Sequence, residues 1–385
     1  MHTAPPWSRR LFVLICLLAF SRGLVDRPAS AQSVDVPEWA KDALWYQIFP
    51  ERFRNGDPAN DPSPADIRGA WPHVIPDGWR LDVAEHVKLR FWKALRTEVR
   101  RINPQAYLVG EVWWQDWPNF QMLNARPWLE GDAFDAVMNY RWASASRKLF
   151  LGADLRSGET AGPSTFFAEL GRLLADYPSE VNYVLMNTYD SHDTDRLASQ
   201  TVNPQTVFDH RIGPNDDPRY QVRKPTARER EVQRLMLVHQ FTAVGAPHLL
   251  YGDEVGMWGA DDPDCRKPML WSDRNYADEV SHPLGQNRPS DPVEVDHGLF
   301  EFYQKLIRLR RSHRALSRGT FRALLADDAA RTLAYERQFS DQLIWVAFNL
   351  GEQPVELKLP LQSADKSTPR GAVAALAGRR VFDPP

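Results

Sequence analysis

Three acidic residues that could act as nucleophiles or as acid–base groups stand at or just after the ends of short apolar runs: Asp82, Glu111 and Asp193. Side chains alternate along a strand, so Arg80 and Asp82 would lie on one face. An arginine at that position favours the ionised form of the aspartate, as a nucleophile requires. A structural ion pair inside a barrel predicts the same alternation, and this segment alone leaves both interpretations open.

Glu111 ends the apolar run Ala106 to Val112 and is followed by the indoles of Trp113 and Trp114. A carboxyl group in such surroundings is partly removed from water, which raises its pKa. A raised pKa suits a general acid, because the group then keeps a proton that it can donate. The alternative interpretation is a glutamate at the edge of a loop.

The third position lies in a dense polar stretch, Asp190 to Arg196, which follows the apolar run Asn182 to Met186. Burying so many ionisable groups costs free energy unless they bind something. A metal ion is one such ligand, but the spacing of His192 and the aspartates matches no strong metal motif. We therefore assign no metal ligands.

Two facing carboxylates with a third nearby suit the hydrolysis of glycosidic bonds, in which one attacks the anomeric carbon and the other protonates the leaving oxygen. Sugar rings also present C–H faces that pack on aromatic planes. Six indoles near these segments are candidates for such contacts, with core packing as the alternative for each: Trp45, Trp79, Trp113, Trp114, Trp117 and Trp258.

The elements that must position these residues alternate between strands and helices, which predicts parallel βαβ units and an α/β barrel. In such a barrel the active site lies at the carboxyl ends of the strands. Strands are predicted at 44–49, 79–83, 106–112, 134–140, 182–186 and 248–251, and helices at 87–102, 165–176, 228–243 and 298–313. Residues 203–226, rich in Pro, Asp and Arg, predict a long surface loop.

The pattern changes after residue 318, where strands at 332–335, 342–348 and 355–359 predict a small antiparallel β domain. The boundaries follow as a signal peptide at 1–31, a catalytic barrel at 32–318 and this β domain at 319–385. The first segment has a basic stretch, a ten-residue apolar run from Leu11 to Phe20 and the cleavage site Ala29-Ser30-Ala31. That pattern predicts cleavage after Ala31 and a secreted or periplasmic protein with no membrane span after cleavage.

Composition supports a globular enzyme. The 385 residues are 43% hydrophobic and 25% charged, with a formal net charge of −3. This balance gives no electrostatic support for nucleic-acid binding. Two cysteines exclude a disulfide scaffold, and no Gly-rich nucleotide loop indicates an organic cofactor.

Taken in order, these motifs resemble those of the α-amylase family of retaining glycoside hydrolases, in the branch of the neopullulanases, cyclomaltodextrinases and maltogenic amylases. The segments that carry the resemblance are 45–53, 78–82, 110–113, 191–196, 251–257 and 262–269. The family has a (β/α)8 TIM-type barrel followed by an antiparallel β domain.

The resemblance implies a role for each matched residue. Asp82 would be the nucleophile, with Arg80 as its partner, and Glu111 the acid/base. Asp193 would stabilise the transition state, and His192 would bind substrate hydroxyls. Further candidates for substrate binding in the same motifs are Trp113, Asp195 and Arg196.

The chain departs from the family pattern between the first-strand and fourth-strand motifs. Only 28 residues, Pro50 to Asp77, separate them, whereas one βαβ unit takes about 30 residues. Strands two and three, the third-strand motif and the inserted subdomain therefore have no room, and about six of eight barrel strands remain. We expect this loss to weaken or abolish activity.

The resemblance predicts an exported hydrolase that cleaves α-glycosidic bonds of maltodextrins or cyclodextrins with retention of configuration. The alternative is a catalytically weak or inactive carbohydrate-binding protein on a degenerate amylase scaffold. The partner is an α-glucan, with no nucleic acid. No cofactor is required, a structural Ca²⁺ is allowed by the resemblance but has no assigned ligands, and the oligomeric state is left open.

Overall fold

A computed structural model of the chain describes residues 12–19, 34–54, 77–153, 162–210, 212–357 and 373–377. Within these ranges, six short strands run parallel to their neighbours. They are β2 (Trp45–Gln47), β3 (Gly78–Leu81), β4 (Tyr107–Gly110), β7 (Ala136–Val137), β8 (Met186–Thr188) and β9 (Ala246–Leu250). Every residue of β4 and β9 is buried, as expected for a parallel sheet that is covered on both faces.

The six strands form one continuous series. Strands β3, β4 and β7 pair in that order, as do β8, β9 and β2, and a parallel bridge between Met138 and Met186 joins the two halves. No pairing connects β2 to β3 in the described part of the chain. The incomplete barrel of about six strands is thus confirmed, and we call this series the six-stranded arc.

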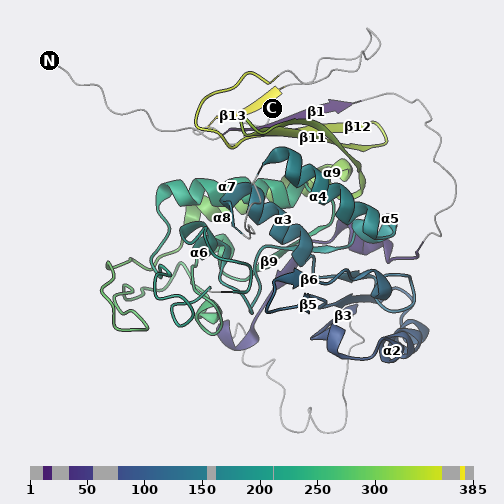
Figure 1. The fold of residues 1–385 in the computed structure, drawn as a ribbon, viewed down its shortest axis with the longest axis horizontal. Coiled ribbons are helices and arrows are strands. Elements are labelled where there is room, and N and C mark those ends of the chain that lie inside the picture. The colour runs from purple at the N-terminus through teal and green to yellow at the C-terminus, as the bar shows by residue number, and fades with distance from the viewer. Residues whose placement is uncertain are drawn as a thin grey trace.

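Helices alternate with the strands (Figure 1). Their first turns show why they begin where they do: Thr226 and Glu229 form a reciprocal capping box at one helix, and Pro163 opens another. All four predicted helices are confirmed, with ends within two residues. The full set is α2 (Leu89–Ile102), α3 (Tyr140–Leu151), α4 (Pro163–Asp176), α5 (Ser179–Asn182), α6 (Leu197–Val202), α7 (Ala227–Thr242), α8 (His297–Ser312) and α9 (Arg314–Arg318).

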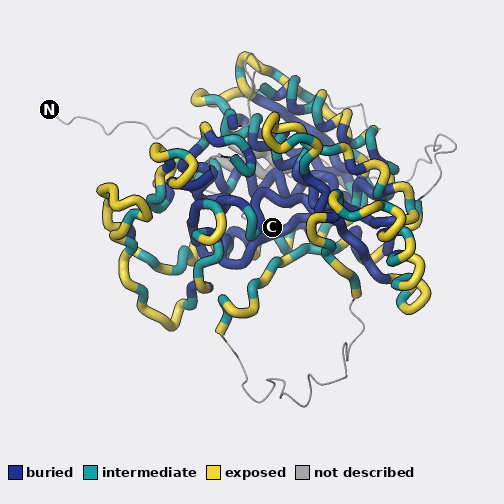
Figure 2. Tube along the Cα trace, turned by 60° about the horizontal axis from the view of Figure 1, so that its bottom comes forward, coloured by how far each residue is buried: buried dark blue, intermediate teal, exposed yellow. Residues whose placement is uncertain are grey.

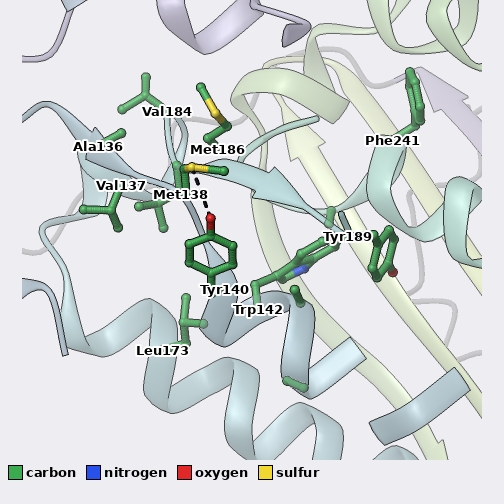
Figure 3. Packing of buried hydrophobic residues seen from close by; sticks show 14 of the residues in the cluster. Ala136, Val137, Met138, Tyr140, Trp142, Leu173, Val184, Met186, Tyr189 and Phe241 are labelled. Carbon is green, nitrogen blue, oxygen red and sulfur yellow. Dashed lines mark hydrogen bonds between the residues drawn. The ribbon is translucent and has the colours of Figure 1, made fainter. Parts of the chain in front are cut away.

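Buried segments gather in the middle of the molecule (Figure 2), and one large buried cluster takes its members from both the arc and these helices. Trp142 of α3 belongs to it and is stacked on His239 at 5.2 Å between ring centroids and 4.8 Å from the Tyr189 ring. Tyr140, two residues earlier, donates its hydroxyl to the Met138 sulfur at 3.4 Å (Figure 3). Helix α3 is therefore fixed against β7 and β8 by its own buried aromatic side chains.

An antiparallel sheet packs on the helices at the far side from β3 and α2 (Figure 1), which confirms the predicted C-terminal β structure. Its strands pair in the order β10 (Thr320–Asp327), β11 (Thr332–Phe339), β12 (Gln342–Asn349), β1 (Phe12–Ala19) and β13 (Val373–Ala377). Arg337 of β11 is fully buried and donates to the Thr242 carbonyl of α7 at 2.6 Å. This bond anchors the sheet to the barrel helices.

One predicted strand is wrong, and another is described only in part. The run 182–186 begins in α5, which starts after Pro178, and only Met186 belongs to a strand, because a short apolar run cannot distinguish a buried turn from a strand. Residues 355–357 have no regular structure, and 358–359 lie outside the described residues. Several described elements were not predicted, among them a hairpin of β5 (Trp114–Asp116) and β6 (Gln121–Met122) directly after β4.

The apolar run predicted as the core of a signal peptide contains β1, which pairs with both β12 and β13. The proposed cleavage site at Ala31 lies outside the described residues. Of the helices that are described, none is long and apolar enough to cross a bilayer.

Candidate active site

Arg80 brings the predicted nucleophile and the predicted acid/base together. Asp82 follows β3 directly, and Glu111 follows the neighbouring strand β4. One guanidinium nitrogen of Arg80 donates to Asp82 Oδ1, and the other donates to Glu111 Oε1 at 2.5 Å. The alternation predicted for Arg80 and Asp82 is thus confirmed by their contact, and a single cation holds both carboxylates.

Glu111 is the buried member of the pair. Its side chain is 9% exposed, whereas that of Asp82 is 66% exposed. The Val83 amide donates to Glu111 Oε2 at 2.9 Å, and the Tyr140 hydroxyl donates to Oε1 at 3.3 Å. Burial raises the pKa of Glu111, although Arg80 and the Val83 amide oppose this. Desolvation is therefore the dominant effect, as the apolar strand and flanking indoles predicted.

Asp193 reaches the same arginine from the other half of the arc. It follows β8, and its Oδ2 lies 3.8 Å from Arg80 Nη2. His192 Nε2 lies 3.1 Å from the same oxygen. All three predicted carboxylates, with Arg80 and His192, therefore form one cluster at the carboxyl ends of the strands.

Gln47 at the end of β2 was not predicted as part of the site. Its amide nitrogen lies 2.7 Å from His192 Nδ1. If this amide donates, His192 is the neutral tautomer with its proton on Nε2, which can then donate to Asp193. Burial lowers the pKa of His192, and the nearby Arg80 and Arg266 lower it further against the attraction of Asp193. These effects favour the neutral imidazole.

Arg266 is a second residue that sequence reasoning did not place in the site. Its Nη2 donates to Asp193 Oδ1 at 3.0 Å and also pairs with Asp262 at 2.8 Å. Its Nε donates to the His192 carbonyl at 2.8 Å, and its guanidinium lies over the Phe49 ring. The motif 262–269 was noted for its resemblance, and the charge of Arg266 within it was the available signal.

Two residues predicted to bind substrate are buried. Asp195 and Arg196 are 1% and 0% exposed. Asp195 accepts from the Tyr220 hydroxyl at 3.0 Å, and Arg196 pairs with the buried Asp253 at 2.8 Å. These contacts fit positions that support the 190–196 loop rather than positions that touch a sugar.

Trp113 is likewise buried, at 7% exposed. Its ring stacks on that of Tyr140 at 3.9 Å and an interplanar angle of 9°, so it backs the residue that donates to Glu111. Among the other candidate indoles, Trp258 is buried and Trp45 and Trp114 are half-buried. Trp79 and Trp117 are the exposed ones, at 41% and 50%.

The described residues contain no group of three His, Cys, Asp or Glu side chains arranged to hold a metal ion. The cations that surround the carboxylates are instead Arg80 and Arg266. The cluster as described supplies an exposed carboxylate, a buried carboxyl group with a raised pKa and a third carboxylate held by two arginines. That set is suited to glycosyl transfer through an attacking group and a proton donor.

Comparison with known proteins agrees with this chemistry. Residues 63–319 match the family model of the alpha-amylase catalytic domain. A cyclomaltodextrinase from Bacillus sp. is 37% identical over 273 residues, covering 71% of this chain and 38% of that protein. Neopullulanase 2 from Thermoactinomyces vulgaris is 35% identical over 297 residues, covering 77% of this chain and 41% of that protein.

A solved cyclomaltodextrinase structure superimposes with a TM-score of 0.51 at 36% identity, covering 71% of this chain and 37% of that one. The chain thus spans about two fifths of the length of the curated relatives that it matches. The family model covers well over half of this chain. The chain therefore belongs to the α-amylase family of glycoside hydrolases, in the branch of the cyclomaltodextrinases, neopullulanases and maltogenic amylases.

Proposed function

We propose that the protein hydrolyses α-glycosidic bonds of maltodextrins or cyclodextrins with retention of configuration. The observation that carries this proposal is the contact of one guanidinium group, that of Arg80, with Asp82, Glu111 and Asp193. A retaining mechanism needs the attacking and proton-donating carboxyl groups roughly 5–5.5 Å apart. The shared contact with Arg80 keeps the two carboxyl groups in one small cluster, which supports a short separation of this kind.

Each carboxyl group has an environment suited to a separate step. Asp82 is exposed and ion-paired, so it is accessible to the anomeric carbon and ready to form the glycosyl-enzyme bond. Glu111 is buried with a raised pKa, so it can protonate the leaving oxygen and afterwards accept a proton from the attacking water. Asp193, held by Arg80 and Arg266, would stabilise the positive charge that develops on the sugar ring.

The substrate class rests on the relatives. The proteins matched at 35–37% identity are a cyclomaltodextrinase and a neopullulanase. Because the chain spans about two fifths of their length, the substrate is part of the proposal. Transglycosylation is a close variant, since a sugar hydroxyl can replace water in the second step.

The test is the release of reducing sugar from maltodextrin by the purified protein and by Glu111→Gln. Glu98→Gln is the matched control, because Glu98 is an exposed glutamate on α2 that pairs only locally with Arg101. General acid catalysis contributes roughly 10²–10⁴-fold, so Glu111→Gln should lose at least a hundredfold of the rate and Glu98→Gln none. Products that first appear as α-anomers support retention; β-anomers, or equal rates in all three proteins, contradict the proposal.

The open edges of the arc favour a second candidate, an inactive α-glucan-binding protein. Strands β2 and β3 do not pair within the described residues, and a catalytic group displaced by about 1 Å can cost roughly a hundredfold in rate. Saturable binding of maltodextrin without sugar release would select this candidate.

Export is a further part of the proposal and rests on the sequence alone. Cleavage after Ala31 would remove β1 and leave β12 without one neighbour. The mass and N-terminal sequence of protein recovered outside the cytoplasm decide the point: a chain that starts at Gln32 supports export, and an intact N-terminus contradicts cleavage.

A further inference from the structure

The loop of residues 203–226, predicted only as a surface loop, packs into the core beside the site. Phe208 is 1% exposed, and its ring lies 5.6 Å from that of Trp113 and 5.8 Å from that of Tyr140. The Tyr140 hydroxyl in turn donates to Glu111. The loop is therefore separated from the proposed acid/base by a single layer of side chains.

Beside Phe208, the loop joins the β5–β6 hairpin through a shared carboxylate. Asp209 Oδ2 accepts from the indole nitrogens of Trp114 at 3.1 Å and Trp117 at 3.0 Å. The His210 ring stacks on Trp117 at 4.3 Å between centroids and an angle of 30°. Phe120 meets His210 edge-on at 4.2 Å. We call Trp117, Phe120 and His210 the aromatic platform.

The platform is exposed although its members are held firmly. Half of Trp117 and 39% of Phe120 remain accessible. The indole N–H of Trp117 donates to Asp209, and this bond fixes the orientation of the ring. Phe120 has a φ of 56°, a left-handed conformation that a bulky residue rarely adopts. Such conformations persist where the surroundings impose them, often at ligand sites. An exposed and preorganised aromatic surface is what stacking on a sugar ring requires.

Asp209, which accepts a hydrogen bond from Trp117 of the platform, also interacts with a carboxylate of the site. Burial raises the pKa of Asp209 to about 6, the two indole N–H groups oppose this, and the negative charge of Asp193 raises it further. Asp209 is thus near enough to Asp193 for their charges to interact.

We propose that the aromatic platform binds glucosyl units of the α-glucan on its leaving-group side. This rests on the proposed function, in which Glu111 protonates the leaving oxygen, so the sugars beyond that oxygen extend past Glu111. The platform connects to the site through Trp114, whose ring meets His210 edge-on at 5.2 Å and stacks on Trp113 at 5.6 Å. Trp113 in turn stacks on Tyr140, which donates to Glu111. It would hold the departing oligosaccharide in the first step and an incoming acceptor sugar in transglycosylation.

The test compares two substrates that differ only beyond the cleaved bond. Maltohexaose can place glucosyl units on the leaving-group side, whereas α-maltosyl fluoride places only fluoride there. Trp117→Ala should lower kcat/KM for maltohexaose about tenfold more than kcat/KM for α-maltosyl fluoride. Phe91→Ala, which removes an exposed ring on α2, should change neither. Equal losses on both substrates, or no loss, would overturn the proposal.

Binding gives a readout that does not depend on turnover. Calorimetry of maltohexaose with Glu111→Gln and with Glu111→Gln/Trp117→Ala should show about tenfold weaker binding for the double variant. Equal binding constants, or no binding by either protein, would overturn the platform. Trp117-dependent binding without any sugar release by the wild-type protein would overturn the proposed hydrolysis alone and leave the platform supported.

Discussion

A buried pair of carboxyl groups below the site carries the prediction that the structure defines most sharply. Asp190 and Asp253 are each 2% exposed and hydrogen-bonded to each other. Arg196, fully buried, donates to Asp253 at 2.8 Å. Burial raises the pKa of both carboxyl groups, and that of Asp253 the more, since the charge of Asp190 adds to the effect of burial. We therefore expect Asp253 to keep a proton and to donate it to Asp190.

This proton makes stability depend on pH. In the unfolded chain an aspartate releases its proton near pH 4, whereas the folded Asp253 keeps it. The folded state then binds one more proton than the unfolded chain. The contribution of this proton to the free energy of unfolding is fully present below about pH 4 and is lost as pH rises, until the folded Asp253 also ionises. The slope approaches about 1.4 kcal/mol per pH unit for one proton.

Asp253→Asn should remove that slope at little cost. An asparagine amide can donate to Asp190 and accept from Arg196, so it imitates the protonated carboxyl group. The free energy of unfolding of the Asp253→Asn variant should therefore stay within about 1 kcal/mol of that of the wild-type protein at pH 5. Asp253→Ala removes both bonds and leaves the buried Arg196 without one of its partners, which costs about 3–5 kcal/mol. In a chain of this length that cost lowers the melting midpoint by roughly 4–6 °C.

The assay is urea unfolding at pH 5, 6.5 and 8, followed by tryptophan fluorescence. Asp273→Asn is the matched control, because Asp273 is an exposed aspartate paired with Arg54, and it should leave the pH slope unchanged. The assignment of the proton to Asp253 is refuted if Asp253→Asn is as damaging as Asp253→Ala, or if it keeps the slope of the wild-type protein.

Two further predictions concern the Gln47 contact with His192 and the packing of two glycines. Gln47→Glu should raise the pKa of His192 by placing a negative charge beside Nδ1, whereas Gln47→Leu should not. NMR of the imidazole across a pH titration measures this pKa, and an unchanged value in Gln47→Glu contradicts the contact. Gly110→Ala should destabilise the protein by about 1–3 kcal/mol, since the added Cβ would lie 2.3 Å from the Phe134 ring. At Gly171 on α4 an added Cβ would meet open space, so Gly171→Ala should stabilise the protein by about 0.5–1 kcal/mol. Chemical denaturation measures both changes, and equal effects would contradict the close packing of Gly110 on Phe134.

The catalytic cluster could be predicted because its residues are fixed by strand geometry. Arg80 and Asp82 are two residues apart, and Glu111 ends the neighbouring parallel strand, so alternation and strand ends place all three together. The barrel and its missing strands also follow from the sequence, since the length between β2 and β3 decides how many units fit.

The remaining contacts depend on loop packing and could not be predicted. Gln47 and His192 are 145 residues apart, and Trp117 and Asp209 are 92 apart. No periodic pattern relates residues of different loops. Burial of Asp195 and Arg196 was missed for a related reason. Ionisable residues in a site motif suggest contact with substrate, but these two bond to Tyr220 and Asp253 from other loops.

The open arc changes how the site is held together. In a closed barrel, backbone pairing on both sides fixes every strand, whereas here β2 and β3 each lack a described neighbour on one side. Side chains cross the arc instead. Trp45 of β2 stacks on Tyr107 of β4 at 4.9 Å.

At the opposite ends of the strands, Arg80 of β3 lies 3.8 Å from Asp193 after β8. On or beside β2 and β3, Tyr46, Ile48 and Trp79 are each at least 40% accessible. Accessible apolar side chains next to strands that lack a described neighbour favour self-association. Because Arg80 both neutralises the carboxylates and links the two halves of the arc, alignment of the three carboxylates depends on this one side chain more than it would in a complete barrel.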